Sequence, residues 1–281
     1  MISMKQSNEI RLVIADVDRT LVNDERILTP RTKDVIEKLW KNGVMFGIAS
    51  GRDYHQLLDD NPYWGFERPF DVTVGMNGGQ VYIAEEGKMH AYNQLSCETV
   101  KEIIELMEPL DLNPLVYGPD KTMICKRMDH LTKASGERND MTVHVVEDLS
   151  EFWQSPKPKI MYRIDAEQME EVQAYADAHP SDKYRAFKTQ PIMIEFQDPN
   201  INKGTGLERV CELLNISTDE VLAFGDMDND IEMLKTAGHG VCLLNGSDET
   251  KASADAVTDY TNNEDGLARY IEDYFPELIG E

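Results

Sequence analysis

The stretch Leu12-Val13-Ile14-Ala15-Asp16-Val17-Asp18-Arg19-Thr20 decides the fold of this chain. Its four leading apolar residues predict a short strand that is buried on both faces, as strands of parallel sheets are. Thr29 and Pro30 then introduce apolar residues at helical spacing, which predicts a helix that ends at Gly43. A second apolar run follows over residues 44–49. Strand, helix and strand in this order predict an α/β fold with a parallel sheet.

The same alternation returns in the last third of the chain. A helix is predicted over 206–214, a buried strand over 221–224 and a second helix over 231–237. A short strand over 240–243 and a final helix over 266–274 follow. These segments therefore extend the sheet that the N-terminal strands begin.

The middle of the chain has a different pattern. Short apolar runs are separated by turns, and helical spacing appears near 100–107 and 169–176. This pattern predicts an antiparallel sheet with about two helices on one face. We therefore expect an α/β protein with a Rossmann-like parallel-sheet core, formed by residues 1–85 and 198–281, and an inserted α+β domain over 86–197.

The charge balance limits the partners of this protein. Among 281 residues, 28 are basic and 52 are acidic, which gives a net charge of −24. So large an acidic excess argues against nucleic acid and anionic membranes as partners, because both require a basic surface. A small anionic substrate is still allowed, since salt screens the surface field over about 8 Å and nearby cations or a metal can build a local anion site.

Two further features concern the compartment. The four cysteines, Cys97, Cys125, Cys211 and Cys242, lie far apart, which favours free thiols over disulfides or a zinc site. The first eleven residues lack an apolar signal segment, and no apolar run approaches the roughly 20 residues of a membrane helix. We therefore expect a cytoplasmic protein.

Polar side chains gather where three predicted strands end. The segments are Asp16–Asp18, Ser50–Gly51 and Asp226–Asp230. In an open α/β sheet, ligands bind at the carboxyl ends of the strands, so these segments converge if their strands are neighbours. Several carboxylates in one place repel one another unless a hard divalent cation lies among them. The sequence therefore predicts a magnesium site that also receives a substrate phosphate.

These segments carry a family resemblance. Asp16–Thr20, Ser50–Arg52, Lys203–Gly204 and Gly225–Asp230 resemble the four ordered motifs of the haloacid dehalogenase superfamily. More narrowly, the chain resembles the Cof-like sugar-phosphatase branch, because its insert falls between the second and third motifs. The resemblance covers essentially the whole chain. It implies a Rossmann-like core with a mobile α/β cap of the C2 type.

The resemblance also implies catalytic roles. Asp16 is expected to be the nucleophile that forms an aspartyl-phosphate, which splits one difficult displacement into two. Asp18 is expected to be the general acid for the leaving alcohol and then the base for the attacking water. Lys203 is expected to bind phosphate and to neutralise developing charge.

Further positions are expected to bind phosphate or metal. The phosphate-binding set comprises Val17, Ser50, Gly51, Lys203 and Asn229. Magnesium is expected on Asp16, on the backbone carbonyl of Asp18 and on Asp226, with Asp230 outside the metal shell, where it orients Lys203 or a metal-bound water. We further expect Arg52 to make a structural ion pair and the Thr20 hydroxyl to order the first loop.

Arg19 departs from the pattern of this branch, which usually has glycine there. Glycine suits a tight turn beside the second aspartate, whereas arginine places a long cation at the site. Two interpretations stay open: the side chain points away, or it contacts a second anionic group of the substrate.

The resulting functional hypothesis is a cytoplasmic Mg²⁺-dependent phosphatase that acts on small phosphate monoesters, sugar phosphates being favoured. Two alternatives remain: a sugar phosphomutase with the same Asp16 chemistry, and a catalytically quiet regulator that binds a phosphorylated metabolite. Release of free phosphate distinguishes the phosphatase from both.

Overall fold

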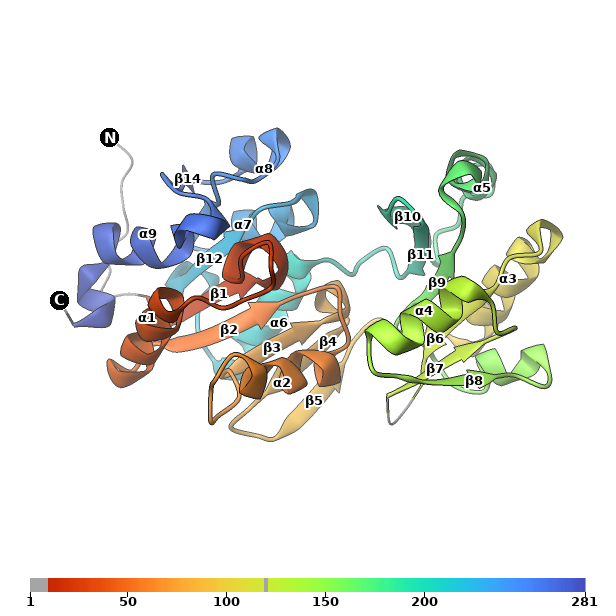
Figure 1. Cartoon of the computed structure of the whole chain (residues 1–281), viewed down its shortest axis with the longest axis horizontal. Coiled ribbons are helices and arrows are strands. Elements are labelled where there is room, and N and C mark those ends of the chain that lie inside the picture. Colours follow the sequence, from red (N-terminus) through yellow and green to blue (C-terminus); the bar gives the residue numbers. More distant parts are fainter. Residues whose placement is uncertain (1–9, 119–120, 281) are drawn as a thin grey trace. The chain divides into compact units, whose positions relative to one another are not determined.

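The computed structural model describes residues 10–118 and 121–280 (Figure 1). It divides the chain into two compact units. Unit 1 combines Met1–His90 with Asn202–Glu281, and unit 2 is the continuous segment Ala91–Ile201. Each unit has a sheet and a hydrophobic core of its own.

Unit 1 is built on an eight-stranded sheet of order β14-β13-β12-β1-β2-β3-β4-β5. Its strands are β1 (Leu12–Asp16), β2 (Met45–Ala49), β3 (Val72–Gly75), β4 (Gln80–Ile83), β5 (Lys88–Ala91), β12 (Val221–Gly225), β13 (His239–Cys242) and β14 (Ala256–Val257). The strands from β14 to β3 pair in parallel, and β4 is antiparallel to β3. The predicted parallel α/β core is thus confirmed.

The central position of β1 explains its composition. Every residue of Leu12–Asp16 is buried, because β12 and β2 flank the strand and helices cover the sheet. The helices of unit 1 are α1 (Pro30–Lys41), α2 (Tyr54–Tyr63), α6 (Lys203–Leu214), α7 (Ile231–Thr236), α8 (Asp248–Ser253) and α9 (Gly266–Tyr274). Helix α1 begins as predicted: the Thr29 side chain accepts a hydrogen bond from the backbone N–H of Thr32, and Pro30 occupies the first turn.

Unit 2 contains a six-stranded sheet of order β10-β11-β9-β6-β7-β8. Its elements are α3 (Cys97–Met107), β6 (Pro114–Tyr117), β7 (Thr122–Cys125), α4 (His130–Arg138), β8 (Thr142–Val145), β9 (Ile160–Arg163), α5 (Met169–Asp177), β10 (Arg185–Gln190) and β11 (Met193–Gln197). Side chains from α3 and α5 join Tyr162 and Phe196 of the sheet in one apolar cluster.

The expected antiparallel sheet of unit 2 needs one correction. Strand β8 pairs with β7 in parallel, because the connection between them crosses over through α4. The sequence analysis did not predict α4. Within this helix only Thr132, Ser135 and Gly136 are buried, so the segment lacks the apolar stripe by which an amphipathic helix is recognised.

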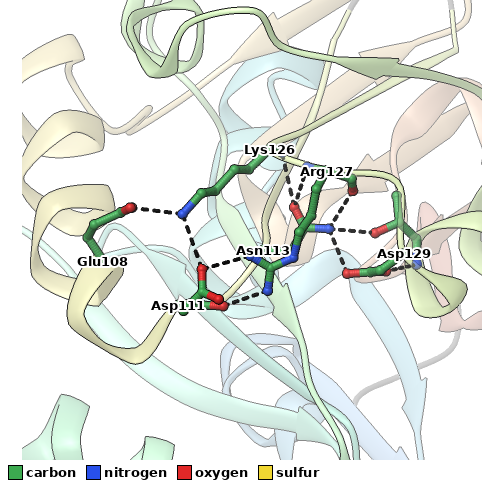
Figure 2. A network of polar contacts seen from close by, with 7 residues as sticks. Glu108, Asp111, Asn113, Lys126, Arg127 and Asp129 are labelled. Carbon is green, nitrogen blue, oxygen red and sulfur yellow. Dashed lines mark hydrogen bonds and ion pairs between the residues drawn. The ribbon is translucent and has the colours of Figure 1, made fainter.

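A buried asparagine holds the turn that leads into α4 (Figure 2). The Asn113 Oδ1 accepts hydrogen bonds from the backbone N–H groups of Lys126 and Arg127, at 3.0 and 3.1 Å. Its Nδ2 donates to the carbonyl of Arg127 and to the side chains of Asp129 and Thr132. One side chain thereby satisfies several polar groups of the turn between β7 and α4.

In the part of the chain that the structure describes, no helix is both long enough and apolar enough to span a membrane.

The core of unit 2 provides a test of this architecture. Phe196 is fully buried, and its ring lies 5.8 Å from that of Tyr162 and 5.7 Å from that of Tyr184. We expect Phe196→Ala to lower the free energy of unfolding by about 3–5 kcal/mol, because it leaves a cavity. The matched control is Met128→Ala, since Met128 is 53% exposed in the same unit. Urea denaturation measures both variants, and equal losses would contradict the core described here.

Candidate active site

The sheet brings the three predicted segments to one edge of unit 1. Strand β1 lies between β12 and β2, with Ala15 opposite Phe224 and Asp16 opposite Ala49. Because all three strands run in parallel, Asp16, Ser50 and Asp226 lie at or just beyond the same level of the sheet. This edge is formed by the carboxyl ends of the strands, where open α/β sheets bind ligands.

Lys203 connects the end of β1 to the loop after β12. It is the first residue of α6, and its side chain is fully buried. Its Nζ donates to Asp16 Oδ1, and also to Asp230 Oδ1 at 2.5 Å. A buried ammonium requires such partners, because an unpaired charge in the interior is costly.

Asp230 is itself held by the backbone of the loop after β12. Its Oδ2 accepts hydrogen bonds from the N–H groups of Asp226 and Met227, at 3.0 and 3.1 Å. Gly225 permits this close packing, since a Cβ there would lie 2.5 Å from the Cβ of Asp230. Both oxygens of Asp230 are therefore occupied within the protein.

Asp226 is partly satisfied. Its Oδ1 accepts a hydrogen bond from the Thr20 hydroxyl at 2.9 Å, whereas its Oδ2 is buried with no hydrogen-bond partner. Ligand oxygens of Asp16, Asp226 and Asp230 all lie within 4.8 Å of one another. A buried carboxylate oxygen that lacks a donor, next to other carboxylates, fits a hard cation with oxygen ligands.

The charges of this cluster do not balance. Three carboxylates, Asp16, Asp226 and Asp230, face the single ammonium of Lys203. Burial, with repulsion from Asp230, raises the pKa of Asp226 to about 6. Burial and the neighbouring carboxylates raise the pKa of Asp16 to about 8 against the opposing effect of Lys203. Burial alone would lower the pKa of Lys203, but Asp16 and Asp230 raise it above its usual value. The cluster therefore favours an additional positive charge, either protons or a metal ion.

The Asp18 carboxylate forms a separate ion pair. The Nη2 of Arg52 lies 2.5 and 2.6 Å from its two oxygens, and Arg26 Nε lies 3.9 Å from one of them. The Nη1 of Arg52 in turn donates to Asp60 of α2 at 3.0 Å. Arg52 thus makes the expected ion pair, but its partner is the predicted general acid, which the sequence analysis did not foresee.

Thr20 has a more direct position than expected. Its hydroxyl bonds to the Asp226 carboxylate, so it connects the loop after β1 to the loop after β12. The sequence shows a hydroxyl residue four positions after Asp16, but no local pattern shows that its hydroxyl bonds to Asp226.

The predicted phosphate-binding residues differ in their surroundings. Ser50 is buried, and its Oγ accepts a hydrogen bond from the backbone N–H of Arg52 at 3.3 Å. The Val17 side chain lies in the hydrophobic core, so only its backbone faces the loop. Asn229 is exposed in the turn between Asp226 and Asp230. The position of Asn229 leaves its amide accessible to a ligand.

Asn77 follows β3 and is not among the predicted site residues. It has a left-handed backbone, with φ of 55°, and its buried Oδ1 has no hydrogen-bond partner. A Cβ on Gly51 would lie 3.2 Å from that oxygen, so Asn77 borders the predicted phosphate loop. The sequence Asn77-Gly78-Gly79 is typical of a turn, but nothing local shows that this turn lies beside Gly51.

Asp228 does not join the acidic cluster. Its Oδ1 accepts a hydrogen bond from the Ser247 hydroxyl at 2.6 Å. Ser247 caps α8, so Asp228 links the loop after β12 to that helix.

The fold and this edge define an α/β protein in which a buried lysine joins two carboxylates at the carboxyl ends of the strands, and the comparisons with known proteins give its family. The profile of the haloacid dehalogenase-like hydrolases matches residues 13–271. This chain belongs to that family.

Relatives and solved structures extend the match over nearly the whole chain. A 5-amino-6-(5-phospho-D-ribitylamino)uracil phosphatase of Bacillus subtilis is 29% identical over 269 residues, which cover 94% of this chain and 97% of that protein. A phosphoglycolate phosphatase of Methanopyrus kandleri is 27% identical, with 95% and 98% covered. A crystal structure from Thermotoga maritima superposes with a TM-score of 0.84 at 28% identity, with 94% and 97% covered. The chain is therefore a phosphatase of this family.

The raised pKa of Asp226 predicts how stability depends on pH when no divalent cation is present. Between about pH 4 and pH 6 the native state holds a proton on Asp226 that the unfolded chain has already lost, so the free energy of unfolding falls as pH rises. Asp226→Asn removes this contribution. In chelator, the variant should gain about 2–3 kcal/mol over the wild type across this range. Urea titrations at several pH values measure the gain. Asp228→Asn is the control, and an equal gain there would contradict the prediction.

Proposed function

We propose that this chain is a magnesium-dependent phosphatase that hydrolyses small phosphate monoesters, sugar phosphates being favoured, through an aspartyl-phosphate intermediate. The observation that carries the proposal is the buried Asp16, whose Oδ1 is bound by Lys203 and which lies beside the unpartnered Oδ2 of Asp226. A carboxylate so fixed presents its other oxygen in one orientation, as a nucleophile requires.

The reaction proceeds in two displacements at phosphorus. In the first, Asp16 Oδ2 forms a bond to phosphorus while the bond to the leaving oxygen breaks, and Asp18 gives its proton to that oxygen. In the second, Asp18 takes a proton from water, whose oxygen bonds to phosphorus while the bond to Asp16 breaks. Inorganic phosphate and the free alcohol are the products, and both aspartates return to their starting states.

The residues of the cluster fit a magnesium ion. Asp16, Asp226 and the backbone carbonyl of Asp18 would hold it, since Asp230 has both oxygens occupied. When bound, Mg²⁺ would neutralise the repulsion between the carboxylate nucleophile and the phosphate. Asp230 accepts a hydrogen bond from Lys203 and so holds its ammonium group beside Asp16.

The phosphate is bound by groups around this cluster. Ser50 supplies a hydroxyl, and Gly51 and Val17 supply backbone groups at the ends of β2 and β1. Lys203 neutralises charge that develops on the phosphoryl oxygens, and Asn229 offers an amide. These assignments agree with the convergence of all five residues on one edge of the sheet.

Arg52 has a place in this scheme. Bound to Asp60 and to Asp18, it holds the Asp18 carboxylate outside the acidic cluster. For Asp18 to act as a general acid, this ion pair must open when substrate binds, and the freed carboxylate must take a proton from solvent before it gives one to the leaving oxygen. Arg52 therefore positions the general acid rather than contacting phosphate.

We further propose that the inserted domain, residues 86–197, serves as a cap that excludes water and selects the leaving group. Its insertion in the sequence between Arg52 and Lys203 supports this role, because both ends of the inserted domain then lead to segments that carry site residues. The two relatives named above differ in substrate at similar identity, so the shared class is a small phosphate monoester. Four free cysteines are consistent with a cytoplasmic enzyme.

The nucleophile assignment is tested by Asp16→Asn. The change keeps the size of the side chain but removes the attacking carboxylate. Phosphate release from a panel of sugar phosphates with Mg²⁺ should fall by about 10³-fold or more, while circular dichroism stays unchanged. Turnover at the wild-type rate would remove Asp16 from the mechanism. Transfer of phosphate to sugar without release into solution would favour a mutase.

The metal assignment is tested by binding rather than by rate. A saturating concentration of Mg²⁺ should raise the Tm of the wild-type protein by about 5 °C, because it binds only the native state. Asp226→Asn should lose most of this shift. Asp228→Asn should keep it, because its carboxylate bonds to Ser247 outside the cluster. An undiminished shift in the Asp226 variant would place the ion elsewhere.

A further inference from the structure

Arg19 has an unusual backbone conformation in the loop after the predicted nucleophile. Its φ is 66° and its ψ is 8°, the left-handed region that glycine adopts freely and that is costly for a residue with a Cβ. The loop is held there from outside, because the Asn245 side chain donates a hydrogen bond to the Arg19 carbonyl at 2.9 Å. The backbone conformation therefore gives no reason for arginine at this position, so we consider what its side chain contacts.

The other cations of this edge are all paired with carboxylates. Lys203 contacts Asp16 and Asp230, whereas Arg52 and Arg26 both face Asp18. Their charges are therefore balanced within the protein before any substrate arrives. They leave no free cation for a second negative group of a ligand.

Arg19 differs from them. Among the residues that the structure describes, its guanidinium makes no ion pair, and its one hydrogen bond is a long one, 4.0 Å, to the Met227 Sδ. Asp24 lies within its electrostatic reach: hydrogen bonds from Asn263 and Asn262 lower the pKa of that carboxyl most, and the charge of Arg19 lowers it further. Asp24 already accepts hydrogen bonds from the amides of Asn262 and Asn263, one on each oxygen.

The location of this free cation is informative. Met227 directly follows Asp226, so the guanidinium lies against the loop that carries the proposed metal ligand. Both Arg19 and Met227 are exposed, which leaves the guanidinium open to a ligand. In a protein with a net charge of −24, an anion needs such a local cation to approach.

We propose that Arg19 is a specificity-determining residue that binds a second anionic group, a carboxylate or a further phosphate, on a substrate whose phosphate monoester occupies the proposed site. This inference rests on the proposed function and narrows its substrate class to phosphate monoesters that carry a second, separate acidic group. A guanidinium recognises either group through paired hydrogen bonds, so the two share one chemistry.

The test uses substrates that differ only in the second anion. One pair is 3-phosphoglycerate and glycerol 3-phosphate, and another is 6-phosphogluconate and sorbitol 6-phosphate. The wild type should prefer the acid of each pair. Arg19→Gln should lower kcat/KM for the substrates with a carboxylate by about 10–100-fold. For the partners that lack the carboxylate, kcat/KM should change by less than about 3-fold. A second phosphate is tested in the same way with a sugar bisphosphate.

Three variants separate charge from backbone. Arg19→Lys keeps the charge and should retain part of the preference, whereas Arg19→Gln and Arg19→Gly should both lose it. Because glycine relieves the left-handed conformation and glutamine does not, equal losses in these two assign the effect to the guanidinium. If Arg19→Gln lowers kcat/KM equally for substrates with and without the carboxylate, the proposal is overturned.

A binding measurement keeps this test independent of turnover. In the Asp16→Asn protein with Mg²⁺, calorimetry should show tighter binding of 3-phosphoglycerate than of glycerol 3-phosphate, and Arg19→Gln should abolish the difference. Equal affinities for 3-phosphoglycerate and glycerol 3-phosphate in the Asp16→Asn protein, in which Arg19 is unchanged, would refute the second-anion site. If no substrate releases phosphate but the difference in binding is present, the proposed hydrolysis fails and the Arg19 site stands.

Discussion

The bridge from Lys203 to Asp16 and Asp230 is the interaction on which the rest of unit 1 depends. It joins the end of β1, the start of α6 and the loop after β12 in a buried position. Three carboxylates share this region with one ammonium, so the arrangement is short of positive charge. Arg52 and Arg26 do not relieve the deficit, because both face Asp18 instead. Binding of the proposed metal ion would therefore be linked to the stability of the fold through the same few side chains.

Much of unit 1 follows from sequence because its strands are short apolar runs. The strands β1, β2 and β12 were predicted at nearly their observed positions, since burial on both faces leaves a continuous hydrophobic signature. Helices α2 and α4 were not predicted. Only Leu57 and Asn61 are buried in α2, and α4 buries no large apolar side chain. Propensity and periodicity carry little information about helices whose buried faces are polar or small.

The candidate site could be predicted at the level of which residues gather, but not of how each side chain is oriented. Asp16, Asp226 and Asp230 converge because parallel strands end together. Asp18 and Asp228 belong to the same two segments, yet each bonds to a partner distant in sequence, Arg52 and Ser247. Such orientations depend on tertiary contacts, which no local pattern encodes.

The placement of β1 has a consequence for how the molecule is assembled during synthesis. One neighbour of β1 is β2, which follows within the same N-terminal segment, but the other is β12, and the Thr20 to Asp226 bond spans 206 residues. A nascent chain therefore exposes one unpaired edge of a strand whose first four residues are apolar until the ribosome has passed β12. Unit 2, by contrast, is continuous and has all of its strands available earlier. Premature pairing at that open edge, rather than loss of the finished fold, is the hazard that this chain topology creates.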